Sequence, residues 1–242
     1  MLHRVTLAFS AAALIPLAFA AACGSDATEP DEIANVRVVN ASASTAGLGA
    51  TTEGRIVATS IPFQGATQPG TCPTVEHGSD EQIDFTTAGT SNSLGSVQYN
   101  FVAKQNYTVV FYAPNNAVVY PDVFVDPTAG NNAIRFINAT GTAGDIYLSQ
   151  PAANIVAPAT IASLAAGQVS GFNSSSAPGG TFVQYNAVNT RVRLFNPGQT
   201  TGTPRADFTI GSMPANRVAT ILLTPPPSGG VATGFMVMPC GS

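Results

Sequence analysis

The sequence contains no tryptophan, and charged residues make up only 9% of its 242 positions. Once the first 22 residues are removed, 8 basic and 13 acidic residues remain, a formal charge of −5 (8 − 13). This balance argues against nucleic acid as a partner, because phosphate binding calls for clustered cations. Sugar-binding modules usually stack sugars on exposed tryptophan or tyrosine. The six tyrosines here fall mostly within strand patterns, where packing is their default role. The sequence therefore leaves carbohydrate binding open but does not support it.

Histidine is almost absent as well. His77 is the one histidine beyond the first 22 residues, so any Ser-His-Asp or Cys-His arrangement depends on it. It lies in the polar run 76–81 (EHGSDE), which we expect to be a solvated loop. The spacing of a calcium-binding EF-hand is missing, and zinc would need more histidines or cysteines. We predict no catalytic residue, no metal site and no cofactor. The alternative is a secreted hydrolase or metal-dependent enzyme that uses the His77 loop.

The N-terminus has the pattern of an export signal. Arg4 and the terminal amine supply the positive charge, residues 5–19 are mostly apolar, and Ala20-Ala21-Ala22 provides the small residues that a signal peptidase requires. Pro16 and the lack of a charged stop-transfer flank argue against a transmembrane helix. We therefore expect residues 1–22 to be a signal peptide.

The segment Ala20-Ala21-Ala22-Cys23-Gly24 resembles the lipobox of bacterial lipoproteins, in which the cysteine becomes residue 1 and carries the lipids. The usual pattern has leucine where this chain has Ala20. The resemblance implies a lipidated Cys23, with enough hydrocarbon for stable membrane attachment. Because Gly24 is not aspartate, it also implies an outer-membrane or cell-surface destination. The alternative is a simple secretory signal with an unmodified Cys23. Residues 23–34 are polar and predict a flexible tether.

The remaining chain, about 210 residues, is long enough for one large β domain or for two of roughly 100 residues each. The 23 glycines and 18 prolines of the full sequence, together with the absence of convincing helical periodicity, favour strands and turns. A repeat within this region favours two domains. Val36–Ser42 (VRVVNAS) and the opening of Ile134–Leu148 (IRFINATGTAGDIYL) both have an apolar strand with one arginine, followed by Asn-Ala-Ser or Asn-Ala-Thr.

Further segments of the two halves correspond in the same order. QGATQPGTC resembles NSSSAPGGT, QIDFTTAG resembles RVRLFNPG, FYAPNN resembles LLTPPP, and VFVDP resembles FMVMP. The small, Gly-rich segment 45–52 is where we expect the first half to depart from the second. We predict an all-β protein with two tandem immunoglobulin-like β-sandwich modules, at 35–130 and 131–242.

The repeated segments resemble the opening of the DUF4397 domain, a family of unknown function found in bacterial secreted proteins and lipoproteins. Its pattern runs V-R-hydrophobic-hydrophobic-[HN]-A-S, a short loop, then D-V-Y-V. Residues 104–110 and 214–220 resemble its later segment, P-A-G-x-Y-T-V-x-V. The family often has histidine where this chain has Asn40 and Asn138, which argues against a histidine role there. The resemblance covers about residues 35–239. It implies an immunoglobulin-like fold in the cell envelope and supplies no catalytic residue.

The number of cysteines predicts one disulfide. With Cys23 taken by lipid, Cys72 and Cys240 remain in an oxidising compartment, and we expect a disulfide between them. Closing a loop of that length would stabilise the fold by roughly 5 kcal/mol in the chain-entropy model, before strain is subtracted. Two separate thiols are the alternative.

Three arginines lie within strand-like segments: Arg37, Arg135 and Arg193. An alternating strand directs such a residue away from the core, so we expect solvated surface charges rather than ligand-binding groups. Together these patterns predict a lipid-anchored protein of the cell envelope, with non-enzymatic modules in a structural, adhesion or binding role. Its expected partners are the membrane, through the lipid, and an envelope protein or a glycan.

Overall fold

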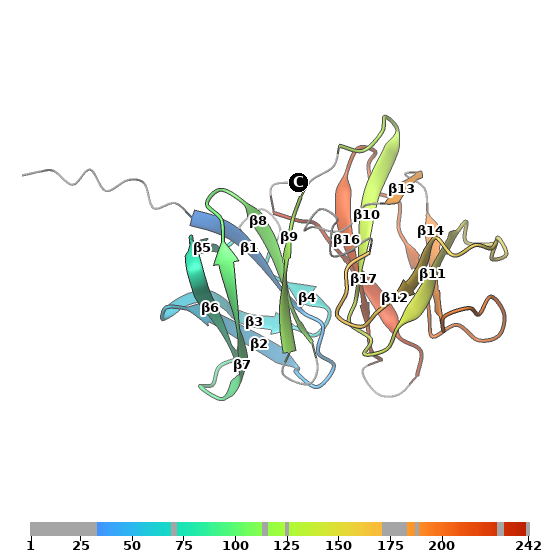
Figure 1. Ribbon diagram of the computed structural model, residues 1–242. Coiled ribbons are helices and arrows are strands. Elements are labelled where there is room, and N and C mark those ends of the chain that lie inside the picture. Colours follow the sequence, from blue (N-terminus) through green and yellow to red (C-terminus); the bar gives the residue numbers. More distant parts are fainter. Residues whose placement is uncertain are drawn as a thin grey trace, which may run out of the picture. The chain divides into compact units, whose positions relative to one another are not determined.

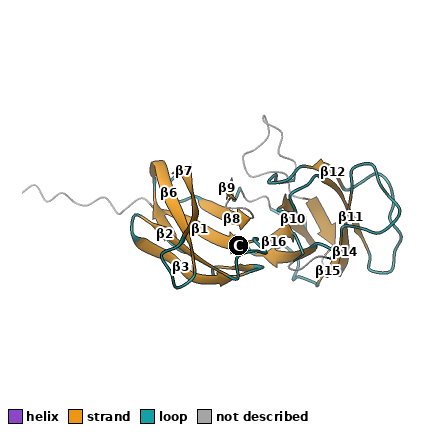
Figure 2. Cartoon of the chain, turned by 90° about the horizontal axis from the view of Figure 1, so that it is seen from below, coloured by secondary structure: helices purple, strands orange, loops and turns teal. Residues whose placement is uncertain are grey.

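The computed structural model describes residues 33–68, 72–112, 116–123, 126–170, 183–186, 189–226 and 230–240. Every regular element in these ranges is a β-strand, which confirms the predicted all-β class (Figure 2). Within the same ranges there is no apolar helix of membrane-spanning length. The predicted signal peptide, Cys23 and the tether up to residue 32 lie outside the described residues.

The first nine strands form two sheets. One has the order β4-β1-β8-β9 with β5 also beside β1, and the other has the order β3-β2-β6-β7. The strands are β1 (Ile33–Asn40), β2 (Gly47–Thr52), β3 (Arg55–Pro62), β4 (Gly65–Ala66), β5 (Thr74–Glu76), β6 (Gly78–Thr87), β7 (Ser93–Phe101), β8 (Asn106–Tyr112) and β9 (Asn116–Pro121). Apolar side chains of both sheets meet in one core, so these strands make a sandwich, which we call the first sandwich.

The other eight strands repeat this plan. Their sheets have the orders β13-β10-β16-β17 and β12-β11-β14-β15, and a second core lies between them, forming the second sandwich. The strands are β10 (Asn131–Asn138), β11 (Gly144–Ser149), β12 (Ile161–Leu164), β13 (Val183–Asn186), β14 (Thr190–Phe195), β15 (Ala206–Ile210), β16 (Val218–Thr224) and β17 (Thr233–Val237). Figure 1 shows the first sandwich in blue to green and the second in yellow-green to red.

Strand bounds and pairing follow the repeat found in the sequence. Strand β10 matches β1 at both ends with a shift of 98 (131 − 33 and 138 − 40), and β16 matches β8 with a shift of 112 (218 − 106 and 224 − 112). In each sandwich the two matched strands pair in parallel, with Arg37 opposite Thr108 and Arg135 opposite Thr220. The register therefore places the two arginines equivalently.

The outer faces of the sheets that contain β1 and β10 are also buried. Val39 and Val110 of the first sandwich share a third apolar cluster with Ile137 and Leu222 of the second. The hydroxyl of Tyr120 donates a hydrogen bond to the Gly167 carbonyl oxygen at 2.8 Å. Strands β1, β8, β10 and β16 are therefore apolar on both faces because both faces are covered. The two sandwiches belong to one compact unit.

A disulfide joins Cys72, in the segment before β5, to Cys240 at the end of the described chain. The two sulfur atoms are 2.01 Å apart and the Cα atoms 6.0 Å apart. This geometry is ordinary for a protein disulfide. The bridge attaches the chain end of the second sandwich to the first.

Two segments differ from the expected pattern. Strand β2 corresponds to β11, although its sequence is small and Gly-rich. Small residues fit there because the strands approach closely: a Cβ added at Gly49 would lie 2.7 Å from the Thr86 hydroxyl oxygen. The predicted loop 76–81 is also wrong, because Glu76 ends β5 and Gly78 begins β6, leaving His77 alone between the strands.

Candidate functional site

The prediction of solvated arginines is wrong, because Arg37, Arg135 and Arg193 are 2%, 0% and 9% exposed. Alternation does direct Arg37 and Arg135 away from the sandwich cores, as expected. The face on which they lie is covered by the neighbouring sandwich, however. Strand alternation determines the face of a residue, and it leaves open what packs against that face. The continuous apolar character of β8 and β16 was the available signal of burial on both sides.

Arg135 lies at the centre of a polar network that links the sandwiches. Its guanidinium forms an ion pair with Asp122, and both side chains are fully buried. It also donates hydrogen bonds to the Thr220 hydroxyl oxygen at 2.9 Å and to the Pro121 carbonyl oxygen at 2.8 Å. The Thr108 hydroxyl donates to Asp122 at 2.9 Å. Burial raises the pKa of Asp122, while Arg135 and Thr108 oppose that shift by favouring the ionised carboxylate.

Within the described residues, Arg37 forms no such ion pair. Its guanidinium donates to the Thr67 carbonyl oxygen at 2.7 Å and contacts the Cys72 sulfur at 3.3 Å, and its Nε has no hydrogen-bond partner in the described chain. Burial lowers the pKa of this guanidinium, and the charge of Asp122 partly opposes the effect. Arg37 and Arg135 are buried, and most of their hydrogen bonds go to other residues of the protein. We therefore assign both a structural role.

Asn40 and Asn138 are buried at equivalent ends of β1 and β10. The amide of Asn40 donates to the carbonyl oxygens of Thr45 and Ile61, and that of Asn138 donates to those of Thr142 and Leu164. In both cases the side-chain oxygen accepts a backbone N–H two residues later. The Asn-Ala-Ser/Thr motif therefore anchors the turn that follows each first strand.

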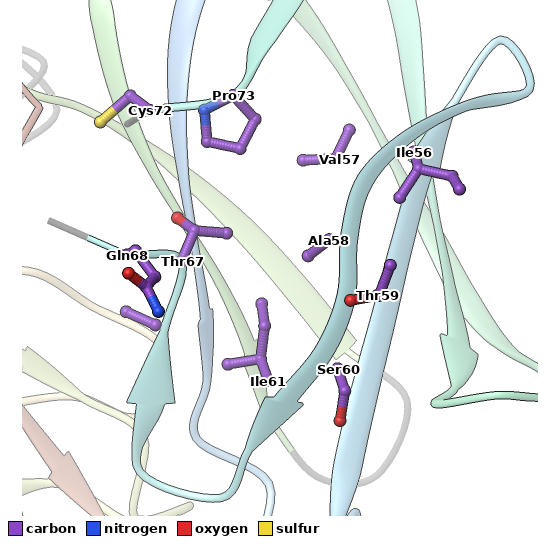
Figure 3. Close-up of a pocket in the computed structure, with 11 residues that line it drawn as sticks. Ile56, Val57, Ala58, Thr59, Ser60, Ile61, Thr67, Gln68, Cys72 and Pro73 are labelled. Carbon is purple, nitrogen blue, oxygen red and sulfur yellow. The ribbon is translucent and has the colours of Figure 1, made fainter. Parts of the chain in front are cut away.

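An open groove lies between two sheet edges of the first sandwich. Strand β3 is the edge of one sheet and β4 the edge of the other, and the space between them measures about 550 Å³. Figure 3 shows Val57, Ala58 and Ile61 projecting from β3 toward Thr67 and Pro73. The described residues that line it offer only apolar, hydroxyl, amide and disulfide groups, and none of them is charged. We call it the β3–β4 groove.

Exposure along β3 sets the groove apart from the buried interface. Val57 and Ile61 are buried in the core, whereas Thr59 and Ser60 are exposed and Ile56 is 70% exposed. The pairing of β3 with β2 has two register irregularities, which bend the strand and break its regular edge. The sequence carries no local signal of this groove, because an edge is defined by long-range pairing rather than by the strand's own residues.

His77, on which any catalytic arrangement would depend, lies away from the β3–β4 groove. It is exposed between β5 and β6 and is not one of the residues that line this groove. Nearby Glu81 has a raised pKa, caused mainly by desolvation and further by Glu53 and Glu76. Within the described ranges, no three histidine, cysteine or acidic side chains come together in a way that could hold a metal ion.

Comparisons with known proteins find only weak similarity in sequence and structure. No curated protein matches the sequence. A solved structure of a streptococcal virulence factor that binds α-glucan is 9% identical, with 79% of this chain and 93% of that chain covered and a TM-score of 0.27. The structure of family 41 carbohydrate-binding modules from streptococcal virulence factors is 10% identical. It covers 83% of this chain and 96% of that chain, with a TM-score of 0.30. A family 26 module from Eubacterium rectale Amy13K, solved with maltoheptaose, is 12% identical. The match covers 85% of this chain and 96% of that chain, with a TM-score of 0.25.

A family model covers the region that contains the groove. The match begins at residue 34 in β1 and ends at residue 149, the last residue of β11. It therefore includes the whole first sandwich and the first two strands of the second. Residues 34–149 match the family described as "Domain of unknown function (DUF4397)".

Proposed function

We propose that this chain is an exported, lipid-anchored protein of the bacterial cell envelope, with a non-enzymatic binding function. Its two sandwiches are the two copies of a duplicated module, with a boundary near residue 130, between β9 and β10. The anchor is a lipidated Cys23 at the start of the tether, and the destination is the outer membrane or the cell surface. The immunoglobulin-like character of each sandwich belongs to the same proposal.

The β3–β4 groove is the observation that carries the binding function. It is open, uncharged and flanked by two strand edges, and it contains no nucleophile with a neighbouring base. Such a lining holds a ligand through apolar contacts and hydrogen bonds rather than by reacting with it. The apolar cluster shared by the sandwiches and the Arg135–Asp122 ion pair hold the two sandwiches together, so the groove belongs to one packed body.

The ligand that we propose is an extended polypeptide segment of another envelope protein. Strand edges present unpaired main-chain N–H and carbonyl groups, which an added strand can satisfy. The irregular register of β3 limits regular pairing to a short stretch. Side-chain contacts with Ile56 and the groove floor then supply the selectivity. A neutral glycan is the competing occupant.

A photo-crosslinking residue at Ser60 tests this proposal in intact cells. Ser60 is exposed and lines the groove, whereas Val102, 51% exposed between β7 and β8, provides a matched control position. We expect an adduct at Ser60 that mass spectrometry identifies as a peptide, and we expect Ile56→Lys to abolish it. Labelling no stronger at Ser60 than at Val102 would overturn the groove as a binding site. A sugar adduct would replace the polypeptide with a glycan.

The anchor has its own test. The intact mass of the protein isolated from its native membranes is expected to equal that of the chain from Cys23 onward plus its lipids. A soluble product whose mass corresponds to an unmodified chain would refute the anchor and leave the groove proposal standing.

A further inference from the structure

A second cavity lies on the outer face of the sheet that contains β14. It measures about 420 Å³, and its lining includes Asn154, Arg191, Arg193, Thr200, Thr201 and Asp207. The two arginines are two residues apart on β14, so they project from the same face of the sheet. The segments that follow β11 and β14 supply the rest of the wall. We call this cavity the arginine pocket. It is separate from the β3–β4 groove, and none of its residues lines that groove.

The ion pairing in the arginine pocket is uneven. Arg191 holds Asp207 with two hydrogen bonds, Nε to Oδ1 at 2.7 Å and Nη2 to Oδ2 at 2.5 Å. Arg193 donates only to neutral acceptors, the Ser149 hydroxyl oxygen at 2.5 Å and the Ala153 carbonyl oxygen at 2.7 Å. Its buried Nε has no hydrogen-bond partner within the part of the chain that is described. The described lining of the pocket therefore carries two cations and one anion.

The buried guanidinium of Arg193 shares its nearest carboxylate with another cation. Arg193 is 9% exposed, and buried charges in proteins are normally paired. Asp207 lies opposite Arg193 in the β14–β15 pairing, but both of its oxygens are hydrogen-bonded to Arg191. Burial lowers the pKa of Arg193 and the charge of Arg191 lowers it further, while Asp207 partly opposes these shifts. Arginine nevertheless stays protonated in proteins, so the positive charge remains. A second anion in the pocket would supply the missing partner.

We propose that the arginine pocket binds the carboxylate of an acidic saccharide, such as a uronic acid residue. A planar carboxylate matches the geometry of guanidinium donors. Asn154, Thr200 and Thr201 add amide and hydroxyl groups suited to sugar hydroxyls. The volume falls within the range of small-molecule sites and leaves room for a short saccharide.

The first sandwich lacks this arrangement. In the correspondence between QIDFTTAG and RVRLFNPG, Gln82 takes the place of Arg191 and Asp84 that of Arg193. Gln82 donates a hydrogen bond to Asp84 at 2.5 Å, so the two side chains are partners of each other and the carboxylate needs no arginine beside it. The fold therefore does not require two arginines there. Their presence in the second sandwich alone fits a role in binding.

Calorimetric titration of the complete mature chain tests the proposal. The probe is digalacturonic acid, and the controls are its neutral counterpart galactobiose, acetate, and the acidic peptide triglutamate. We expect the acidic disaccharide to bind at least tenfold more tightly than each control. Equal binding of galactobiose would refute the charge recognition. Equal binding of acetate or triglutamate would refute the saccharide as the ligand.

Variants connect the binding to the pocket. Arg193→Gln is expected to weaken digalacturonate binding at least tenfold and to lower Tm only modestly, because the chain loses the hydrogen bonds to Ser149 and Ala153 but keeps the Arg191–Asp207 ion pair. Arg193→Lys should recover part of the affinity, since it restores the charge but not the two-pronged geometry. Arg55→Gln, at an exposed arginine of the first sandwich, is the control expected to bind normally. If Arg193→Gln fails to fold, Arg191→Gln, at a partly exposed residue, provides the same measurement. Unchanged affinity in the folded variant would overturn the site.

Discussion

Arg37 and Arg135 have the same place in two copies of one strand, yet their surroundings differ. Each is buried and lies opposite a threonine of the paired parallel strand. Arg135 pairs with a carboxylate, whereas Arg37 is satisfied by a carbonyl oxygen and a disulfide sulfur. Arg135 finds its partner across the interface between the sandwiches, whereas the partners of Arg37 belong to its own sandwich. Equivalent positions in two matched strands can therefore have different partners.

The largest expected effect comes from removing the carboxylate from the network of Arg135. Asp122→Ala leaves a fully buried guanidinium without its ionic partner, which should lower the free energy of unfolding by about 3–5 kcal/mol. Urea denaturation measures the change. The double variant Asp122→Ala with Arg135→Met should lose less than Asp122→Ala alone, because no unpaired charge remains. A double variant that is no more stable would contradict the ion pair as the cause.

Next in size is the loss of the disulfide beside Arg37. Cys72→Ser combined with Cys240→Ser should lower stability by about 2–4 kcal/mol, because the unfolded chain regains the freedom that the bridge removes. Thermal unfolding of this variant and of the wild type, each with and without reductant, provides the measurement. Reductant should lower the Tm of the wild type only. Equal sensitivity of both proteins would rule out the bridge as the source of the loss.

The two buried asparagines should respond alike. Asn40→Ala and Asn138→Ala each leave two carbonyl oxygens without their side-chain donor, at least one of them buried, at an expected cost of about 2 kcal/mol. Chemical denaturation of both variants tests whether the duplicated motif has the same role in each sandwich. A clear difference between the two costs would show that only one copy depends on it.

Arg37→Met is expected to have the smallest effect, under about 1 kcal/mol. It removes a buried charge that forms no ion pair with any residue the structure describes, and methionine fills part of the same space with apolar atoms. Arg135→Met is the matched control, and should cost several times as much because Asp122 is then left unpaired. Equal costs in denaturant titrations would remove the distinction between the two arginines.

The repeat in the sequence predicted much of the fold. The matched strands β1 and β10 follow from their shared Arg and Asn-Ala-Ser/Thr pattern, and the cysteine count predicted a disulfide. The burial of Arg135 did not follow, because it depends on the packing of one sandwich against the other. Its partner Asp122 had no local signal either, since their pairing depends on that packing.

The candidate sites were less predictable than the strands. The β3–β4 groove depends on which strands end as sheet edges, and that is determined by hydrogen bonds between distant residues. The arginine pocket combines β14 with segments that follow β11 and β14, and only the folded chain brings these together. The spacing of Arg191 and Arg193 on one strand was the single sequence signal, and strand alternation alone reads it as surface charge.

The disulfide between Cys72 and Cys240 also changes what a protease can accomplish. A single cut anywhere in the chain between these residues leaves two fragments that remain covalently joined. With the proposed lipid on Cys23, neither fragment would be released from the membrane, so a protein nicked in an exposed loop would still remain at the cell surface as one molecule.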